Sequence, residues 1–203
     1  MKKTQNFQRD IELLFEIGCL RYMPRLWKRF FNPNVANNSE HTLRVIWISF
    51  LLSEYENVKN KDKILKMALV HDLSESRTGD ADYLSRQYIE RKETEAISDI
   101  FKNTSFEKEL PLLWNEYENK TSIEAKIVKD ADNLDVELEL IEQKSRGHII
   151  GSIWTQQRRK LVYSKLYTKS AKKLWNKINK SKINDWHLNA NNRFRGGDWK
   201  NKK

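Results

Sequence analysis

The sequence is poor in the residues that make tight turns and covalent cross-links. Its 203 residues include only 6 glycines, 3 prolines and a single cysteine, Cys19. A sheet-rich fold needs many turns and usually more glycine and proline, so this scarcity favours a mostly helical chain. One cysteine cannot form an intrachain disulfide, and the N-terminus has no signal peptide, so the sequence predicts a cytoplasmic protein.

Long hydrophobic runs are also missing. The apolar stretch at residues 45–52 is far shorter than the roughly eighteen apolar residues of a membrane-spanning helix, so we expect no membrane segment. Hydrophobic residues make up 38% of the chain, and aromatic residues, which bury a large area each, carry much of that fraction. We therefore predict one domain over residues 1–180 and a basic, aromatic, partly packed tail over residues 181–203.

Positive charge predominates. Lysine and arginine number 38 against 28 acidic residues, which gives a net charge of +10, and part of the excess lies between Arg158 and Lys203. Basic surfaces attract anions such as phosphates and nucleic acids. Two interpretations of the C-terminal segment stay open: a solvated helix face, or a nucleic-acid surface on which Trp186, Phe194 and Trp199 stack against bases.

Apolar residues recur at three-to-four spacing along most of the chain, which is the period of amphipathic helices. The pattern predicts helices over residues 4–18, 40–56, 85–102, 105–118, 123–143 and 155–180. A further helix carries His71 and Asp72 and ends at the turn of residues 78–80. Ser39 is the expected N-cap of the second helix. Residues 20–38 form a long, basic and aromatic connection, and long connections of this kind are often binding loops.

Chemically active side chains fall on the inward faces of three of these helices. His41, His71 and Asp72 all lie on the apolar sides of their helices. Asp132 lies among the apolar residues of the long central helix, although helical periodicity alone does not choose between it and Asp130. A buried carboxylate without a partner is very costly, so these acids must be paired or must bind a metal.

Together these side chains offer two imidazoles and two carboxylates. Mixed nitrogen and oxygen ligands suit a divalent first-row transition metal. Such a metal lowers the pKa of a bound water and stabilises charge on a phosphoryl oxygen. Glu75, one turn after His71, is placed to take a proton from that water. A lone inward histidine is more often a hydrogen-bonded core residue than a ligand, so the prediction depends on the combination.

Three short segments carry a resemblance to a known family. The pattern of His41, His71-Asp72 and Asp132 resembles that of the HD-domain metal-dependent phosphohydrolases. The segments SEHTLRV (39–45), HDLSESRTGD (71–80) and VKDADNLD (128–135) are similar to those of the HD-domain 5′-deoxynucleotidases. HDLSESRTGD is the most specific of the three, and the resemblance extends over about residues 10–145.

The resemblance implies an all-α, single-domain HD-type helical bundle that removes phosphate from (deoxy)nucleoside 5′-monophosphates. It implies one divalent metal with the ligands His41, His71, Asp72 and Asp132. Glu75 would activate the attacking water, and Asp80 would position the substrate or its proton network. The family's arginine and tryptophan upstream of the first histidine match best at Arg25 and Trp27, where the arginine orients the phosphate. Lys28 and Arg29 are the alternatives for that role.

No histidine lies between His71 and Asp132, whereas HD enzymes with two metals use additional histidines there. We therefore expect one metal, namely manganese, cobalt, zinc or iron, with magnesium less favoured. The expected partner is a nucleotide substrate. A homodimer is compatible with the sequence, and nucleic acid is disfavoured but stays open.

Two alternative functions accompany this interpretation. One is an HD phosphohydrolase that acts on a nucleoside triphosphate, an alarmone or another phosphoester. The other is a basic nucleic-acid-binding protein with a structural metal. Glu75 and Asp80 distinguish the enzymes from the binding protein, because a protein that only binds needs neither of them beside a metal.

Overall fold

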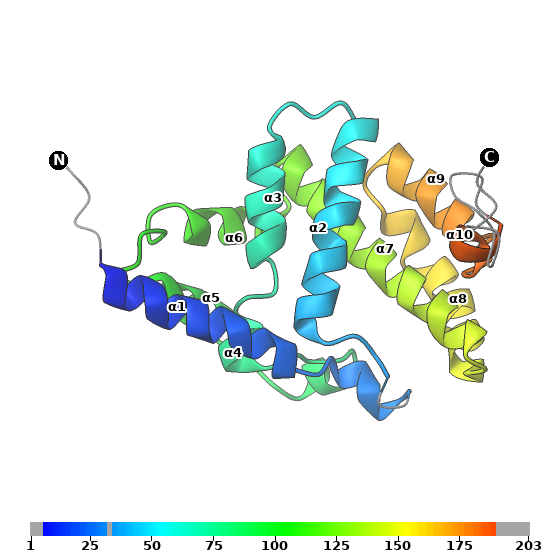
Figure 1. Ribbon diagram of the computed structural model, residues 1–203, viewed down its shortest axis with the longest axis horizontal. Coiled ribbons are helices and arrows are strands. Elements are labelled where there is room, and N and C mark those ends of the chain that lie inside the picture. The colour runs from blue at the N-terminus through cyan, green and yellow to red at the C-terminus, as the bar shows by residue number, and fades with distance from the viewer. Residues whose placement is uncertain (1–5, 32–33, 190–203) are drawn as a thin grey trace, which may run out of the picture.

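The computed structural model describes residues 6–31 and 34–189, which fold into a bundle of helices (Figure 1). The longer helices are α1 (Phe7–Cys19), α2 (Asn38–Tyr55), α3 (Lys61–Val70), α5 (Glu93–Phe101), α6 (Leu110–Asn119), α7 (Ile123–Ser145), α8 (Ile149–Leu161) and α9 (Lys169–Ile178). The short ones are α4 (Glu75–Thr78), α10 (Asp185–Leu188) and the 3₁₀ helices η1 (Leu20–Tyr22), η2 (Leu26–Arg29), η3 (Ser85–Gln87) and η4 (Tyr163–Lys165). No strand occurs in the described ranges, and the predicted all-α fold class is confirmed.

Helix α7 is the central element of the bundle. Ser122 caps its N-terminus by accepting a hydrogen bond from the backbone N–H of Ala125, which is a favourable role for serine. Side chains on more than one flank of α7 are buried, and the helix packs against α2, α3, α6, α8 and α9. A helix that is apolar on two flanks belongs in the middle of a bundle, and Figure 1 shows α2 and α3 crossing α7.

Two apolar clusters hold the helices together. The larger joins α2, α3, α7 and α9, and its buried members include Leu52, Ile64, Leu134 and Trp175. The smaller joins α1, α5, α6 and the end of α3. Side chains of α2, α3 and α7 pack against one another in the larger cluster. This packing fixes the relative positions of the three helices that carry the predicted metal ligands.

Helix α2 begins earlier than predicted, and Asn37 rather than Ser39 is its N-cap. The Asn37 side chain accepts a hydrogen bond from the backbone N–H of Glu40, and the Glu40 carboxylate accepts one from the backbone N–H of Asn37. This reciprocal pair is a capping box. The cap places His41 one turn inside a well-anchored helix.

The helix that carries His71 ends sooner than predicted. Helix α3 stops at Val70 with His71 as its C-cap, and the chain turns before α4 begins. Gly79 follows α4 at a φ of +74°, a conformation that glycine adopts without a steric cost. The positions of Asp72 and Glu75 therefore follow from this turn and not from the periodicity of a continuous helix.

The segment predicted as one helix over residues 155–180 is two helices. Helix α8 ends at Leu161 and α9 begins at Lys169, with η4 between them. Thr168 caps α9 by accepting a hydrogen bond from the backbone N–H of Ala171. The helix predicted over residues 85–102 is also shorter, because the α-helical part begins only at Glu93.

The division between a domain over residues 1–180 and a tail stays a prediction. Trp186 lies in α10 and is 73% exposed, whereas Phe194 and Trp199 lie outside the described residues. Among the helices of the described ranges, none is both long enough and apolar enough to cross a membrane.

Candidate metal centre and active site

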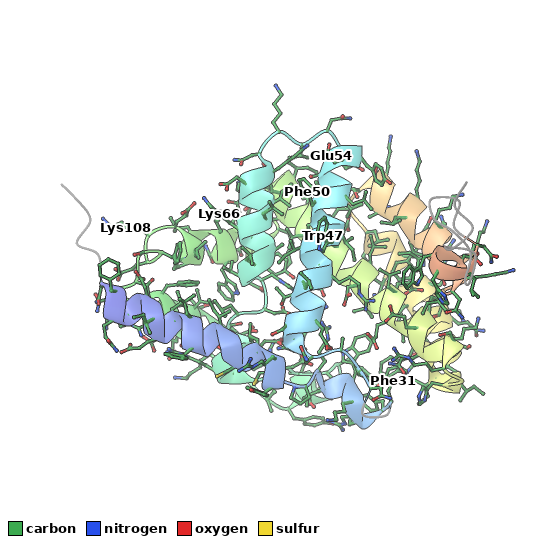
Figure 2. The ribbon with its side chains drawn as sticks, in the orientation of Figure 1. Phe31, Trp47, Phe50, Glu54, Lys66 and Lys108 are labelled. Atoms are coloured by element: carbon green, nitrogen blue, oxygen red, sulfur yellow. The ribbon has the colours of Figure 1, made fainter. Side chains whose placement is uncertain are left out.

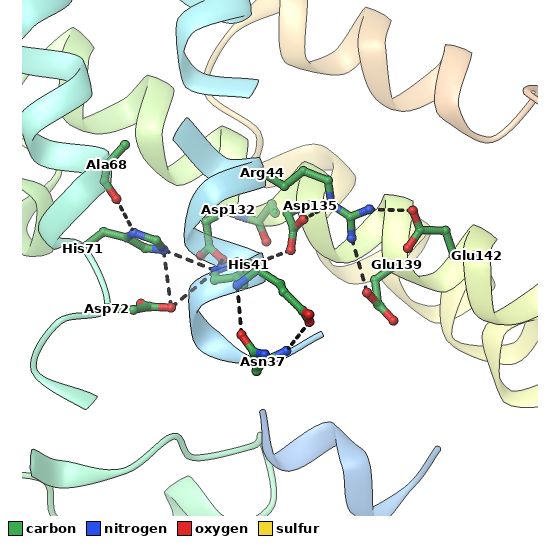
Figure 3. Close-up of polar contacts among 12 residues, drawn as sticks. Asn37, His41, Arg44, Ala68, His71, Asp72, Asp132, Asp135, Glu139 and Glu142 are labelled. Atoms are coloured by element: carbon green, nitrogen blue, oxygen red, sulfur yellow. Dashed lines mark hydrogen bonds and ion pairs between the residues drawn. The ribbon is translucent and has the colours of Figure 1, made fainter. Parts of the chain in front are cut away.

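The four predicted ligands lie close together in the bundle: ligand atoms of His41, His71 and Asp132 all lie within 4.8 Å of one another, and Asp72 lies beside the two histidines. His41 comes from the first turns of α2, His71 and Asp72 from the end of α3, and Asp132 from the middle of α7 (Figure 3). The Nε2 atoms of the two histidines lie 3.2 Å apart, and Asp72 Oδ2 lies 3.3 Å from each of them. Asp132 Oδ1 lies 3.4 Å from His41 Nε2. Three elements that are distant in sequence therefore bring together all four side chains.

His71 is oriented by its own helix. Its Nδ1 atom lies 2.8 Å from the backbone carbonyl oxygen of Ala68, three residues earlier. A carbonyl oxygen only accepts hydrogen bonds, so Nδ1 carries the proton of the neutral ring and Nε2 keeps a lone pair. The lone pair is directed at the cluster of ligand atoms.

His41 is oriented from another helix. Its Nδ1 atom faces Asp135 of α7 at 2.5 Å, and Asp135 is in turn paired with Arg44 of α2. Arg44 also pairs with Glu139 and with Glu142 of α7 (Figure 3). A carboxylate behind a metal-binding histidine fixes its tautomer and ring orientation.

The sequence interpretation missed Asp135, although a signal was present. Asp135 lies three residues after Asp132, and side chains at this spacing share a face of a helix. Lys129, three residues before Asp132, was missed as well. Its Nζ atom donates a hydrogen bond to Asp132 Oδ2 at 2.7 Å. One face of α7 thus carries an acid of the cluster together with the groups that hold and orient it.

The donor set fits a divalent cation. Because both Nδ1 atoms face acceptors, two neutral rings would direct two Nε2 lone pairs at two carboxylate oxygens, with no proton between them. Four acceptors at this spacing need a positive charge among them, and divalent transition metals prefer such mixed ligands. A proton on His41 can also supply this charge. Burial and the nearby Arg25 lower the pKa of His41, but its hydrogen bonds to the surrounding aspartates outweigh them and raise that pKa to about 10.

Glu75 lies beside the cluster, held by two donors. Asn38 Nδ2 donates to its Oε2 atom at 2.7 Å, and Arg91 donates to its Oε1 atom at 3.1 Å. Burial, followed by the negative charges of Asp72 and Asp80, raises the pKa of Glu75 to about 9. A buried carboxyl group with a raised pKa is suited to transferring a proton. Asn38 and Arg91, which orient Glu75, were not predicted from the sequence.

Arg25 brings a positive charge to the same place. It lies just before η2, and its Nη1 atom is buried without a hydrogen-bond partner among the described residues. Burial lowers the pKa of Arg25, but the nearby charges of Asp72 and Asp132 outweigh burial and raise it. A buried donor without a partner is costly, so this guanidinium has an N–H available for an anionic ligand.

Asp80 and Trp27 connect the loop around Arg25 to the rest of the site. Asp80 Oδ2 accepts a hydrogen bond from the backbone N–H of Leu26 at 2.7 Å, which ties η2 to the turn after α4. The Trp27 ring lies 5.7 Å from the Arg25 guanidinium and packs edge to face against Trp154 at 5.1 Å. Asp80 therefore positions the neighbours of Arg25, whatever further role it has toward a substrate.

A cavity of about 820 Å³ opens over the cluster. The predicted residues that line it are Arg25, Trp27, His71, Asp72, Glu75, Asp80 and Asp132. His41 is fully buried behind them. A cavity of this size accepts a nucleotide-sized ligand. A separate groove of about 1040 Å³ runs past Trp47 on α2. Of the predicted site residues and their alternatives, only Lys28 lines it.

The structure separates the two aspartates that helical periodicity did not distinguish. Asp132 joins the cluster, whereas Asp130 accepts hydrogen bonds from the backbone N–H groups of Tyr167 and Thr168, each at 2.8 Å. Asp130 thus anchors the chain just before α9. Asp130 is buried and Asp132 is partly buried, and only Asp132 lines the cavity.

The fold and the site together define a helical protein whose donor atoms could hold a divalent metal and whose acid–base group and cationic wall suit hydrolysis. Residues 17–175 match the family described as HD domain. The chain belongs to the HD domain family, as the resemblance of its motifs predicted.

Curated relatives and solved structures share this family and fold. The chain is 31% identical over 149 residues to 5′-deoxynucleotidase HDDC2 of Homo sapiens, covering 70% of this chain and 72% of the relative. It is 36% identical over 121 residues to 5′-deoxynucleotidase HDDC2 of Dictyostelium discoideum, covering 54% of this chain and 64% of the relative.

Among solved structures, a conserved hypothetical protein from Pyrococcus furiosus has a TM-score of 0.67 and 26% identity, covering 84% of this chain and 99% of its own. A predicted metal-dependent phosphohydrolase from Magnetospirillum magnetotacticum has a TM-score of 0.66 at 19% identity, covering 89% and 94%, and shows the shared fold.

Proposed function

We propose that this protein is a metal-dependent phosphomonoesterase that hydrolyses deoxynucleoside 5′-monophosphates to nucleoside and phosphate. The observation that carries the proposal is the meeting of the ligand cluster, Glu75 and the buried donor of Arg25 at one nucleotide-sized cavity. Relatives named 5′-deoxynucleotidase support the substrate class.

The residues that would hold the metal are His41, His71, Asp72 and Asp132. A divalent cation bound there would lower the pKa of a water molecule and offset negative charge on a phosphoryl oxygen. The mixture of imidazole and carboxylate donors favours manganese, cobalt, zinc or iron over magnesium.

Arg25 binds the phosphate group. Its guanidinium is a fork of N–H donors that matches the oxygens of a phosphate, and its Nη1 atom has no partner among the described residues. Asp80 holds the backbone next to Arg25 through Leu26. Trp27, which follows in η2 and lines the cavity, packs on the sugar of the substrate.

Glu75 accepts a proton from the attacking water through one of its carboxylate oxygens. That role needs the ionised form, which is disfavoured by burial and by the neighbouring charges of Asp72 and Asp80. A divalent cation bound beside Asp72 would offset the charge of Asp72. One cause of the raised pKa of Glu75 would then disappear, and the carboxylate form of Glu75 would become accessible. Asn38 and Arg91 keep both oxygens of Glu75 oriented throughout.

A homodimer and a cytoplasmic location stay predictions. What supports a homodimer is the number of exposed apolar side chains on α1 and α2. Phe15 is 76% exposed, and Trp47 is 65% exposed on a helix that otherwise packs into the bundle (Figure 2).

Phosphate release from a panel of nucleoside mono-, di- and triphosphates tests the proposed function. Metal-stripped protein is resupplied with manganese, cobalt, zinc or magnesium, and Glu75→Gln is compared with wild type. Glu93→Gln is the matched control, because Glu93 also pairs with Arg91 but is not a member of the ligand cluster.

We expect metal-dependent release from deoxynucleoside monophosphates, reduced by about 10²–10⁴-fold in Glu75→Gln and retained in Glu93→Gln. Release from triphosphates or other phosphoesters only would replace the substrate class and keep the site. No release from any substrate by metal-loaded protein, together with salt-dependent binding of oligonucleotides, would favour a nucleic-acid-binding protein instead.

A further inference from the structure

Lys129 lies beside the ligand cluster but has no part in the reaction described so far. It is on α7, three residues before Asp132, and both residues line the cavity. The Lys129 side chain is 33% exposed, so its neighbours cover it only in part. Neither phosphate binding by Arg25 nor proton transfer by Glu75 explains a further cation at this position.

One hydrogen bond fixes the position of the Lys129 ammonium group. Its Nζ atom donates to Asp132 Oδ2 at 2.7 Å, whereas Oδ1 of the same carboxylate lies 3.4 Å from His41 Nε2. One oxygen of Asp132 is thus bonded to Lys129, and the other faces the ligand cluster. The ammonium group therefore lies one hydrogen bond and the width of one carboxylate group from the atom that would bind the metal.

The ammonium group keeps donors for a ligand. A lysine side chain has three N–H donors and no acceptor. Its hydrogen bond to Asp132 uses one donor, and Nζ makes no other hydrogen bond within the described ranges. A compact positive charge of this kind commonly binds phosphate oxygens. Lys129 is therefore able to hold Asp132 and to bind an anion in the cavity at the same time.

Lys129 and Arg25 bring positive charge to the same two aspartates from different segments. The charge of Asp132 raises the pKa of Lys129, burial lowers it, and Asp72 raises it further. Burial lowers the pKa of Arg25, but Asp72 and Asp132 raise it. Arg25 precedes η2, whereas Lys129 belongs to α7. A phosphate group bound at the metal would therefore lie near both cations.

Two other cations of the cavity wall are paired away from the cluster. Arg158 of α8 faces Glu137 at 3.4 Å, and Lys120 lies 3.8 Å from Glu118. Neither of these acids is one of the four predicted ligands. The acid that pairs with Lys129 is one of them, so Lys129 is the better placed of the three to act on a group bound at the metal.

The charge of the substrate favours a second cation beside Arg25. A phosphomonoester carries about two negative charges at pH 7. The charge of a divalent metal would be matched by the two carboxylates of Asp72 and Asp132, which leaves the phosphate to be matched by protein groups. Arg25 supplies one positive charge, and Lys129 supplies the other.

We propose that Lys129 is a second phosphate-binding residue of the active site, which holds Asp132 with one N–H and binds phosphoryl oxygens with the others. The inference rests on the proposed function, because the phosphate of the substrate must lie at the metal. It deepens that function by assigning a further residue to the transferred group. A fixed cation at the phosphoryl oxygens also stabilises the charge that they carry in the transition state.

The test is the Kd for inorganic phosphate, measured by calorimetry on manganese-loaded protein whose metal content is confirmed by elemental analysis. Lys129→Met should raise this Kd by about tenfold or more, as the loss of a hydrogen bond between charged groups does. It should also lower kcat/KM for a deoxynucleoside monophosphate by about 100-fold. Lys129→Arg keeps the charge and should recover part of both losses.

Lys126→Met is the matched control. Lys126 lies one turn earlier on the same helix and is partly buried like Lys129, but its ammonium group lies over the Tyr167 ring and it does not line the cavity. The control should change neither the Kd for phosphate nor kcat/KM.

If Lys129 only holds Asp132, Lys129→Met would weaken manganese binding and leave the Kd for phosphate unchanged once the metal site is filled. That result, or an equal loss of phosphate affinity in Lys126→Met, would overturn the proposal. Failure of the proposed function is a different outcome, in which metal-loaded wild type releases no phosphate from deoxynucleoside monophosphates, whatever its affinity for inorganic phosphate.

Discussion

His41 and His71 direct the same ring nitrogen to the same point, but different kinds of structure orient them. The Nδ1 atom of His71 faces the carbonyl of Ala68 in its own helix, so the ring is held by local backbone. The Nδ1 atom of His41 faces Asp135, which lies 94 residues away in sequence and is itself held by Arg44.

The orientation of His71 therefore depends on no other side chain, whereas that of His41 does. No substitution can remove the carbonyl behind His71, because every residue at position 68 has one. The orientation of His41 depends instead on a chain of ion pairs between α2 and α7. Mutations in the ion pairs behind His41 should therefore weaken metal binding, whereas no side-chain substitution can remove the carbonyl group that orients His71.

The largest effect should come from removing either ring. His41→Asn and His71→Asn should each lose tight metal binding and lower phosphate release by at least roughly a hundredfold. Metal content by elemental analysis and kcat/KM for a deoxynucleoside monophosphate provide the measurement. His187→Asn, in α10, is the control. If one of the two ring variants kept both metal and activity, the histidines would not be equivalent at Nε2.

The next largest effect should come from a substitution that affects the orientation of His41 but not that of His71. Asp135→Asn removes the carboxylate behind His41 and should raise the Kd for the metal by about 10- to 100-fold, as loss of such a partner typically does. Glu139→Gln is the matched control, because Glu139 also pairs with Arg44 but does not contact His41. Metal titration followed by calorimetry gives both values. Equal affinities for the two variants would contradict the role of Asp135.

Arg44 should matter more for stability than for the metal. Arg44→Met leaves the carboxylates of Asp135, Glu139 and Glu142 without their cation. Losing one partner of a fully buried network costs about 3–5 kcal/mol, and because the Arg44 side chain is 28% exposed we expect about 2 kcal/mol. Urea unfolding of metal-free protein measures this.

Lys66→Met is the control for Arg44→Met, since Lys66 pairs with two carboxylates at an exposed position. Exposed pairs contribute about 0–1 kcal/mol. Similar losses of stability for the two variants would show that the network behind His41 is no stronger than a surface ion pair.

The remaining prediction concerns the pH dependence of the metal-free protein. Because folding raises the pKa of Glu75 from 4.5 to about 9, its contribution to stability is present at low pH and is lost as pH rises toward 9. Glu75→Gln cannot ionise, so its Tm should rise relative to wild type between pH 6 and pH 9. Thermal unfolding at both pH values measures the difference, and a constant gap would mean that Glu75 is not perturbed.

Much of the ligand cluster could be predicted because its residues lie in short sequence motifs and on recognisable helix faces. His71 and Asp72 are adjacent, helical periodicity placed His41 on an inward face, and the family resemblance selected Asp132 where periodicity did not choose between it and Asp130. Periodicity says that a side chain is buried but not which partner it meets, and for that reason Asp135 went unnoticed although it shares a face with Asp132.

The C-terminal half was harder to predict for the same physical reason. The break between α8 and α9 depends on Thr168, whose backbone N–H donates to Asp130, 38 residues earlier. An amphipathic pattern that continues through a break gives no warning of such a contact. The cavity face of α8 was likewise hidden, because only the fold shows which side of a helix meets the site.

Whether one metal in the ligand cluster drives hydrolysis is measured by titrating metal-stripped protein with manganese and following phosphate release from a deoxynucleoside monophosphate. We expect activity to rise to a plateau at one metal per chain in wild type and to stay near background in Asp132→Asn over the same range. Full activity after metal removal, or a wild-type plateau shared by Asp132→Asn, would contradict it.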